Sequence, residues 1–404
     1  MDEILRKLEA IEAKLDQMSR HINFIRTHSG TYLGDGVALT HLVDERPMLV
    51  NSNDYGGPLL FISGGRYEDD NVEVLHSFID EHTTTFVDAG ANLGYFSLLI
   101  GSRLLPSGRV FAFEPHPRLA ELARRNAFIN GLESVVTVHP FGLSDAEVET
   151  DFSFPKGHLG GGLIGGIDRP EQFDVVRSRV RRLDDVLDPD VTVDLMKIDV
   201  EGHEPEVMRG MQQIAARSPQ LKILFERLGT HVPRSLQIEA ALQPLGFRLY
   251  GIGVDAQLSL LAPGELAGFS GYVLAARAGQ VDTLDRRRFS IYPSRLVVPG
   301  TATLRAGEGL VSEGTAGQIL FHGPYWFLRS GIWVLHIHGR IEGEIDVLLT
   351  ERFGHVTQSQ RLSAAQLQWQ FHNTQDLVRF EIVGRAASQN ARVEIERLEL
   401  VRLA

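Results

Sequence analysis

The stretch that most constrains this chain is TFVDAGANLGYFS, residues 85–97. Apolar and β-branched residues lead into an acid, Asp88, and then into small residues that include Gly90 and Gly94. An apolar helical pattern follows, so the stretch predicts a strand, a tight turn and a helix start. Glycines allow the backbone to approach a ligand closely, and a helix start offers unpaired N–H groups. The stretch therefore predicts the binding loop of a nucleoside cofactor.

A second acid, Glu114, ends the next apolar run, where it is placed to accept hydrogen bonds from ribose hydroxyls. Two cofactors fit such a unit, a dinucleotide and S-adenosylmethionine. The dinucleotide fingerprint needs a glycine where Asn92 stands. Asp88 would face the pyrophosphate of a dinucleotide, whereas its carboxylate can receive the ammonium of a methionine moiety. The residues therefore favour S-adenosylmethionine, and a dinucleotide remains the alternative.

Three motifs point to a known family: VDAGANLG at residues 87–94, FEP at 113–115 and KIDVEGHE at 197–204. Through them the chain resembles the FkbM family of S-adenosylmethionine-dependent methyltransferases. The resemblance implies a doubly wound, seven-stranded, Rossmann-like α/β domain and methylation of hydroxyl groups, often on sugars or natural products. It also places Ser144 and Asp145 near the adenine. The residues predicted to bind the cofactor are Asp88, Gly90, Asn92, Gly94, Glu114, Pro115, Ser144, Asp145 and Asp199.

Strand and helix patterns alternate from residue 86 to residue 276, which predicts parallel β-α-β units. Four acids each end a predicted strand: Asp88, Glu114, Asp199 and Glu226. Ligands of open α/β sheets bind beyond the carboxyl ends of the strands, so we expect these acids to meet at one rim.

Methyl transfer to a hydroxyl is an in-line displacement that needs a group to accept the hydroxyl proton. We expect Asp199 and Glu201 to position substrate or cofactor, and His203 is the leading candidate for the base. A residue bonded locally at a helix start is the competing interpretation of His203. Glu226 is a candidate second base. Carboxylates of this kind also suit Mg²⁺, but no metal is expected.

The segment KGHLGGGLIGG, residues 156–166, contains six glycines. Such a segment predicts either a mobile lid or an unstructured connection.

Apolar residues recur in steps of three and four from Ile4 to Ile25, which is the pattern of a heptad seam. Residues 1–28 are therefore predicted to form a coiled-coil helix. Leucine at one core position and isoleucine at the other favour a homo-trimer or homo-tetramer. The alternative is an amphipathic helix packed on its own catalytic domain.

Helical patterns nearly vanish after residue 285, and short alternating runs with turn signals take their place. Residues 285–404 are therefore predicted to form an antiparallel, jelly-roll-like β-sandwich, which leaves residues 29–284 for the methyltransferase domain. All three tryptophans, Trp326, Trp333 and Trp369, lie in this module. Indole faces stack on sugar rings, so the module is a candidate for carbohydrate binding; sandwich cores also use tryptophan.

The net charge of -12 argues against nucleic-acid and anionic-lipid partners. The absence of cysteine excludes disulfides and thiolate chemistry. Without a long apolar run or a signal-peptide pattern, we expect no transmembrane segment and a cytoplasmic location.

Together these features predict a cytoplasmic, oligomeric O-methyltransferase that acts on a hydroxyl of a sugar or glycan. Two alternatives remain at this point. One is an NAD-dependent oxidoreductase acting on sugar nucleotides, and the other is a non-catalytic scaffold that carries a lectin-like module.

Overall fold

The structure is a computed structural model of the chain. It describes residues 14, 29–54, 60, 63, 65–104, 107–165, 171–227, 232–253, 256–281, 288–291, 296, 303–305, 309–328, 331–351, 355–374 and 377–403. The predicted coiled coil at residues 1–28 falls, except for Lys14, outside the described residues.

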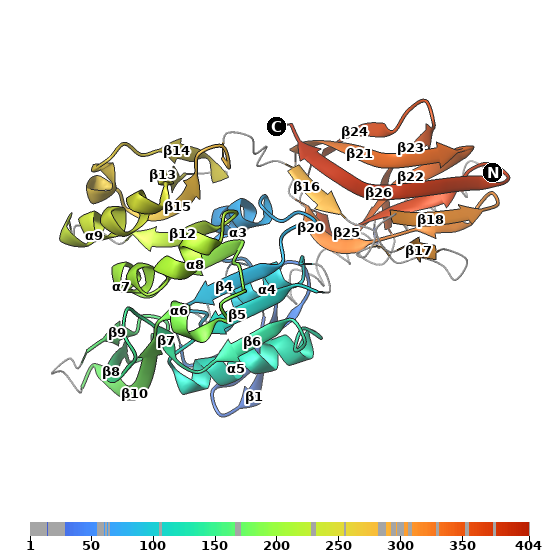
Figure 1. Cartoon of the computed structure of the whole chain (residues 1–404). Coiled ribbons are helices and arrows are strands. Elements are labelled where there is room, and N and C mark those ends of the chain that lie inside the picture. Colours follow the sequence, from blue (N-terminus) through green and yellow to red (C-terminus); the bar gives the residue numbers. More distant parts are fainter. Residues whose placement is uncertain are drawn as a thin grey trace.

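An eight-stranded sheet forms the centre of the first part of the chain (Figure 1). Its strands, in spatial order, are β14 (Leu258–Leu260), β13 (Phe247–Ile252), β15 (Gly271–Arg277), β12 (Lys222–Arg227), β11 (Leu195–Ile198), β4 (Thr85–Ala89), β5 (Arg109–Phe113) and β6 (Val136–His139). Strands β6, β5, β4, β11 and β12 are parallel, whereas β15 is antiparallel to β12 and β13. The prediction of seven strands is short by one, because Leu258–Leu260 folds back on β13 as an antiparallel pair.

The order of the strands fixes the place of a binding crevice. The chain runs outward from β4 through β5 to β6 and then returns to β11 on the other side of β4. Such a reversal leaves a crevice at the carboxyl ends of the two central strands, which is where open α/β sheets bind ligands.

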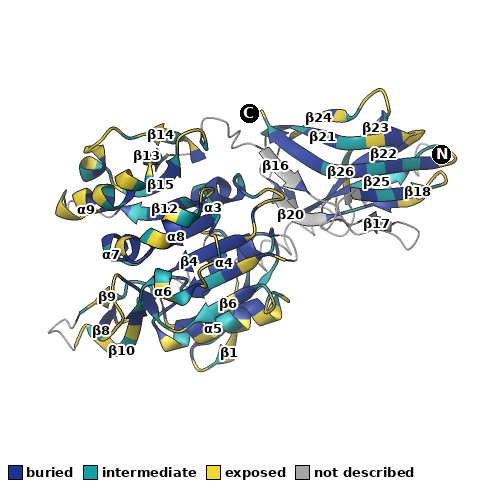
Figure 2. Ribbon diagram, viewed as in Figure 1, coloured by how far each residue is buried: buried dark blue, intermediate teal, exposed yellow. Residues whose placement is uncertain are grey.

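Helices cover both faces of the sheet. The cluster on one face includes residues of α3 (Asp69–His76), α4 (Tyr95–Gly101) and α5 (Pro117–Ile129), and the cluster on the other includes residues of α6 (Leu183–Val186), α7 (Glu204–Arg209), α8 (Gln212–Arg217) and α9 (Val232–Leu242). Successive strand residues point to opposite faces, so Phe86 joins the first cluster and Val87 the second. Both faces of the central strands are buried, as Figure 2 shows.

Two small sheets flank the large one. The first is antiparallel and contains β1 (Thr31–Gly34), β2 (Val37–His41) and β3 (Pro47–Asn51). The Asn126 amide on α5 holds it through two hydrogen bonds with the Leu49 backbone, at 2.7 and 2.9 Å. The second sheet, an insertion between β6 and β11, contains β7 (Gly142–Leu143), β10 (Phe173–Arg181), β8 (Val148–Pro155) and β9 (Leu163–Ile164).

Two antiparallel sheets make up the described C-terminal residues. The first contains β16 (Arg288–Ile291), β17 (Thr303–Arg305), β18 (Gly309–Gly314), β26 (Ala391–Arg402), β21 (Gly331–Glu342) and β24 (Gln368–Asn373). The second contains β19 (Ile319–Phe321), β20 (Pro324–Leu328), β25 (Leu377–Ala386), β22 (Glu344–Glu351) and β23 (His355–Ser363). Trp333 and Leu400 from the first and Phe321 and Phe380 from the second belong to one buried cluster. We call this part the C-terminal β module.

The C-terminal β module lies beside α3 (Figure 1). The guanidinium of Arg402 is 3.9 Å from the carboxylate of Glu73 on α3. Within the described part of the chain, no helix combines the length and apolar character needed to cross a membrane.

Candidate active site

The turn between β4 and α4 brings the backbone close to the end of β11. Gly90 has a φ of 81°, and a Cβ added there would overlap with the carbonyl oxygen of Asp199. Gly94 has the same φ and is the N-cap of α4. Asp88, at the end of β4, is 1% exposed and accepts a hydrogen bond from the Ser97 hydroxyl at 2.6 Å. Burial raises the pKa of Asp88, while Lys197 and that hydrogen bond oppose the shift.

Glu114 follows β5 and faces the same turn. Its carboxylate accepts hydrogen bonds from the backbone N–H groups of Asn92 and His116, both at 2.8 Å. Burial raises the pKa of Glu114 to about 7, although both hydrogen bonds favour the charged form. A carboxylate has room for about four hydrogen bonds, so Glu114 retains acceptor capacity for a ligand.

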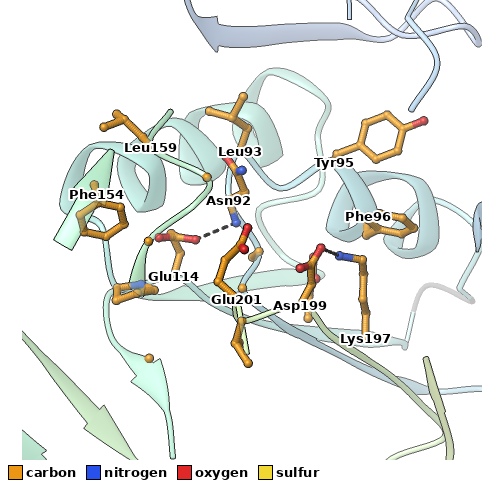
Figure 3. Close-up of a pocket in the computed structure, with 18 of the residues that line it drawn as sticks. Asn92, Leu93, Tyr95, Phe96, Glu114, Phe154, Leu159, Lys197, Asp199 and Glu201 are labelled. Atoms are coloured by element: carbon orange, nitrogen blue, oxygen red, sulfur yellow. Dashed lines mark hydrogen bonds and ion pairs between the residues drawn. The ribbon is translucent and has the colours of Figure 1, made fainter. Parts of the chain in front are cut away.

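A cavity of about 240 Å³ lies over this turn. Figure 3 shows Glu114 and Phe154 at one end and Lys197, Asp199 and Phe96 at the other, with Glu201 between them. Its lining includes the predicted residues Asp88, Gly90, Asn92, Glu114, Pro115, Asp199, Glu201 and His203. Asp88 and Glu114, the acids at the ends of β4 and β5, therefore line the same cavity.

The wall of this cavity fits a nucleoside with an amino-acid tail. Asn92, in the same turn as Gly90, has a buried Oδ1 atom without a hydrogen-bond partner in the part of the chain that the structure describes. A buried amide oxygen without a partner costs about 1 to 3 kcal/mol, so a ligand that donates to it is favoured. Glu114 is suited to ribose hydroxyls and Asp88 to an ammonium.

The KIDVEGHE motif forms the end of β11 and the start of α7. The Asp199 carboxylate is 2.6 Å from the Lys197 ammonium. Glu201 has a φ of 52°, a left-handed backbone that is uncommon outside glycine. The pKa of Glu201 is raised to about 7, mainly by burial and further by the nearby charges of Asp199 and Glu204. Glu204 accepts hydrogen bonds from the N–H groups of Gly202 and Val200 at 3.0 and 3.3 Å, so it stabilises the turn.

His203 lines the cavity, but both of its ring nitrogens face polar side chains. Nε2 is 2.9 Å from the Ser144 hydroxyl, and Nδ1 is 3.4 Å from the Glu206 carboxylate. Burial lowers the pKa of His203, and Glu206 opposes the shift.

Ser144 and Asp145 are not among the described residues that line the cavity. Ser144 contacts His203, and Asp145 pairs with Arg209 at 2.9 Å. Their neighbours Gly142 and Leu143 line the cavity instead.

Glu226, at the end of β12, is likewise absent from the described lining. It lies in register with Tyr272 on β15. Burial raises the pKa of Glu226 to about 8, and the charges of Asp199, Glu201 and Glu68 add to the shift. Of the four acids predicted to converge, three therefore lie on the cavity wall, and the charge of one of these, Asp199, acts on the fourth, Glu226.

The other wall residues were not among the catalytic or cofactor-binding residues predicted from the sequence. They are Met48, Asp54, Leu60, Tyr67, Ala91, Leu93, Tyr95, Phe96, Gly142, Leu143, Phe152, Phe154, His158, Leu159, Gly160, Gly162, Ile164, Lys197 and Val200. Some had a signal, because Tyr95, Phe96 and Lys197 lie inside or beside the recognised motifs. The segments that contribute Asp54 and Tyr67 carry no recognised motif, so spacing alone assigned them no chemistry, although the resembled family can have such a segment beside its active site.

The glycine-rich segment lies against the cavity. Leu159 donates its N–H to the Asp54 carboxylate at 3.1 Å, and Leu159, Gly160, Gly162 and Ile164 line the wall. Part of this segment thus belongs to the cavity wall, and its role as a lid stays a prediction. Among the described residues, no group of three histidine, aspartate or glutamate side chains is arranged to hold a metal ion.

The methyltransferase FkbM domain family matches residues 88–249, which span the turn, Glu114 and the KIDVEGHE motif. Methyltransferase 1 of Beauveria bassiana is 31% identical over 169 residues, covering 35% of this chain and 67% of that protein. The chain belongs to the FkbM methyltransferase family. Its methyl donor is S-adenosyl-L-methionine.

Other relatives match to differing extents. The AMB antimetabolite synthetase AmbE of Pseudomonas aeruginosa is 29% identical over 287 residues, covering 61% of this chain but only 13% of that protein. Methyltransferase sdnD of Sordaria araneosa is 30% identical over 156 residues, covering 31% of this chain and 60% of that protein.

Among solved structures, an O-methyltransferase from Bacillus cereus in complex with SAH is 13% identical, with a TM-score of 0.31, and covers 51% of this chain and 78% of that one. TomG of Streptomyces achromogenes, solved with SAM, is 15% identical, with a TM-score of 0.30, and covers 52% of this chain and 79% of that one.

Proposed function

We propose that this FkbM methyltransferase is an O-methyltransferase that acts on a hydroxyl of a sugar or glycan. The observation that carries the proposal is the Glu201 carboxyl on the cavity wall, whose pKa burial raises to about 7. A carboxyl group with a pKa near neutrality is suited to accept a proton from an attacking hydroxyl. An amine acceptor would place a weaker demand on such a base, because a neutral amine attacks before it loses its proton.

The chain's residues divide the task between two ends of the cavity. Glu114 accepts hydrogen bonds from the ribose, and Asp88 receives the ammonium of the amino-acid tail. Gly90 lets the turn that carries them pack closely against the Asp199 backbone at the end of β11. The donor, when bound, supplies an electrophilic methyl group. Asp199 orients the acceptor hydroxyl, and Glu201 takes its proton.

Glu201 is a better candidate for the base than His203. The Nε2 and Nδ1 atoms of His203 already face Ser144 and Glu206, so a proton transfer from substrate would have to disrupt one of these contacts. The carboxylate of Glu201 points into the cavity in Figure 3. Glu226 is not assigned to the proton transfer, because it lies outside the described lining, although the charges of Asp199 and Glu201 add to the rise in its pKa.

The sugar acceptor is supported by the hydroxyl substrates of the resembled family and by the appended C-terminal β module. We propose that residues 29–284 are the catalytic domain and that residues 285–404 are a jelly-roll-like β-sandwich that binds carbohydrate. Trp333 and Trp369 are 1% and 6% exposed, so they serve the core rather than a sugar platform.

The heptad pattern supports a homo-trimer or homo-tetramer through residues 1–28, in a cytoplasmic protein. Deleting residues 1–25 should dissociate this assembly in sedimentation runs. An unchanged sedimentation mass would contradict the proposed role of the arm.

The proposed reaction is tested in two steps. First, S-adenosylhomocysteine should raise the melting temperature and NAD should not, because a ligand that binds the folded protein and not the unfolded chain stabilises the fold. Second, the enzyme is incubated with isotopically methyl-labelled donor and a panel of neutral glycosides, sugar nucleotides, simple alcohols and amines. Label in an ether of a glycoside supports the proposal, whereas label only in amines contradicts O-methylation.

A further inference from the structure

Lys197 is the feature of the cavity that the proposed reaction has not used. It lies on β11, two residues before Asp199, and is 3% exposed. Its ammonium is 2.6 Å from the Asp199 carboxylate and 4.6 Å from the centre of the Phe96 ring on α4. Figure 3 shows Lys197 and Asp199 side by side at one end of the cavity.

The charges around Lys197 are mostly negative. The described cavity wall carries the carboxyl groups of Asp54, Asp88, Glu114, Asp199 and Glu201, and Lys197 is the one lysine or arginine in that set. Burial alone would lower the pKa of Lys197, but the charges of Asp199, Glu68 and Asp88 outweigh it and raise the pKa. Lys197 is therefore a permanent positive charge. It in turn opposes the rise in the pKa of Asp88, Glu201 and Glu226.

A second lysine shows what a purely structural role looks like in this sheet. Lys222 lies on the adjacent strand β12, and its ammonium is 5.4 Å from the centre of the Phe78 ring. Burial lowers the pKa of Lys222, and Asp80 and Asp194 only partly oppose this. Lys222 is not among the described residues that line the cavity. Both lysines thus pack on a phenylalanine, but only Lys197 holds a carboxylate at the cavity wall.

We propose that Lys197 is a positioning residue for methyl transfer: its ammonium directs the Asp199 carboxylate into the cavity and supplies the fixed positive charge that offsets the carboxylates of the wall. This inference rests on the proposed function, because it assigns Asp199 to the methyl-transfer end. By offsetting part of the negative charge of the wall, Lys197 weakens the preference of the cavity for the positively charged sulfonium donor over its neutral thioether product.

The test compares Lys197→Met and Lys197→Arg with the control Lys222→Met. Calorimetry gives the affinities of each protein for S-adenosylmethionine and S-adenosylhomocysteine at pH 8.5. Without its positive charge the cavity should favour the sulfonium, so the affinity ratio of donor to product should rise about tenfold in Lys197→Met. The ratio should stay within about twofold of the wild type in Lys197→Arg and in the control, since both keep the charge in the cavity.

A structural role alone would weaken both ligands together and leave the ratio unchanged, and that result in a folded Lys197→Met protein would overturn the inference. Lys197→Gln removes the charge but keeps a polar head group, so it provides the same measurement if the methionine variant does not fold. This result can be distinguished from that of the acceptor assay. If the wild-type protein binds both ligands but methylates no hydroxyl, O-methylation is refuted, and the ratio of donor affinity to product affinity can still be measured.

Discussion

At the scale of the residue, two residues of the cavity wall have backbone conformations that are usual for glycine and uncommon for other residues. Asn92 has a φ of 50° and Glu201 a φ of 52°. The left-handed region costs a residue with a Cβ about 1 to 2 kcal/mol, and asparagine tolerates it better than glutamate does. Strain of this kind is retained where the surrounding structure fixes it, often at functional sites. Here it brings the backbone N–H of Asn92 to Glu114 and the carboxyl group of Glu201 to the cavity.

Replacing Gly90 by alanine should destabilise the protein and abolish cofactor binding. The new Cβ would overlap with the Asp199 carbonyl oxygen, at a φ of 81° that already disfavours a side chain. Gly131→Ala is the matched control, because Gly131 also has a positive φ, of 66°, but nothing lies within 4 Å of its Cβ. We expect a loss of about 1 kcal/mol for the control and about 3 kcal/mol or more for Gly90→Ala in urea unfolding. Equal losses would mean that the approach to Asp199 is not tight.

Glu201→Gln should lower the rate of methyl transfer by about 100- to 10,000-fold, the usual contribution of a general base. The wild-type rate should fall as the pH drops below about 7, because the base must be ionised and burial raises the pKa of Glu201 to that value. Glu121→Gln, on the exposed side of α5, is the control and should retain the wild-type profile. A Glu201→Gln enzyme with an unchanged rate and pH profile would show that another group takes the proton.

The residues of the motifs were predictable because each needs a particular chemistry at a particular turn. A glycine at position 90 and acids at 88, 114 and 199 follow from strand-end geometry, and all four line the cavity. The role of Glu201 relative to His203 was not predictable. The comparison depends on the contacts of the His203 ring nitrogens with Ser144 and Glu206, and the local sequence pattern does not show that these side chains meet in the fold.

At the scale of the element, the insertion between β6 and β11 supplies a cavity wall that the core sheet lacks. Strand β8 places Phe152 and Phe154 in the lining, and the segment after it adds Leu159. Gly162 packs directly against Phe154, where a Cβ would overlap with the ring. The glycines here were predicted to give mobility or an unstructured connection. In the structure, Gly162 also allows close packing.

Phe154→Ala should weaken the binding of S-adenosylhomocysteine by about tenfold, since it removes a buried aromatic surface from the wall. The phenylalanine is 2% exposed, so a modest loss of stability should accompany the change. Val175→Ala on the neighbouring strand β10 is the control, because Val175 is 52% exposed and does not belong to the described lining. Calorimetry on both variants measures the difference. If the two bind equally well, the insertion is a neighbour of the cavity rather than part of the site.

At the scale of the whole molecule, the buried apolar residues separate into cores that belong to different parts of the chain. Two clusters cover the two faces of the central sheet, and another contains residues from both sheets of the C-terminal β module. The change from helical to alternating patterns after residue 285 had predicted a separate module there. The contact between α3 and the C-terminal β module was not predicted, because the sequence of neither segment indicates what the segment packs against. A cavity of about 70 Å³ at this contact includes Val72 and Leu400 in its lining, so the two parts meet without merging into one core.

Separate cores predict separate unfolding transitions. In differential scanning calorimetry we expect two, and S-adenosylhomocysteine should raise only the transition of the catalytic part, because the cavity lies wholly within residues 48–203. Phe321→Ala should lower only the other transition. Phe321 is fully buried in the C-terminal β module and packs on Gly384, and removing such a side chain costs about 3 to 5 kcal/mol. A single transition that responds to both the ligand and the substitution would instead show that α3 couples the parts into one cooperative unit, in which case the module would contribute directly to the stability of the methyl-transfer site.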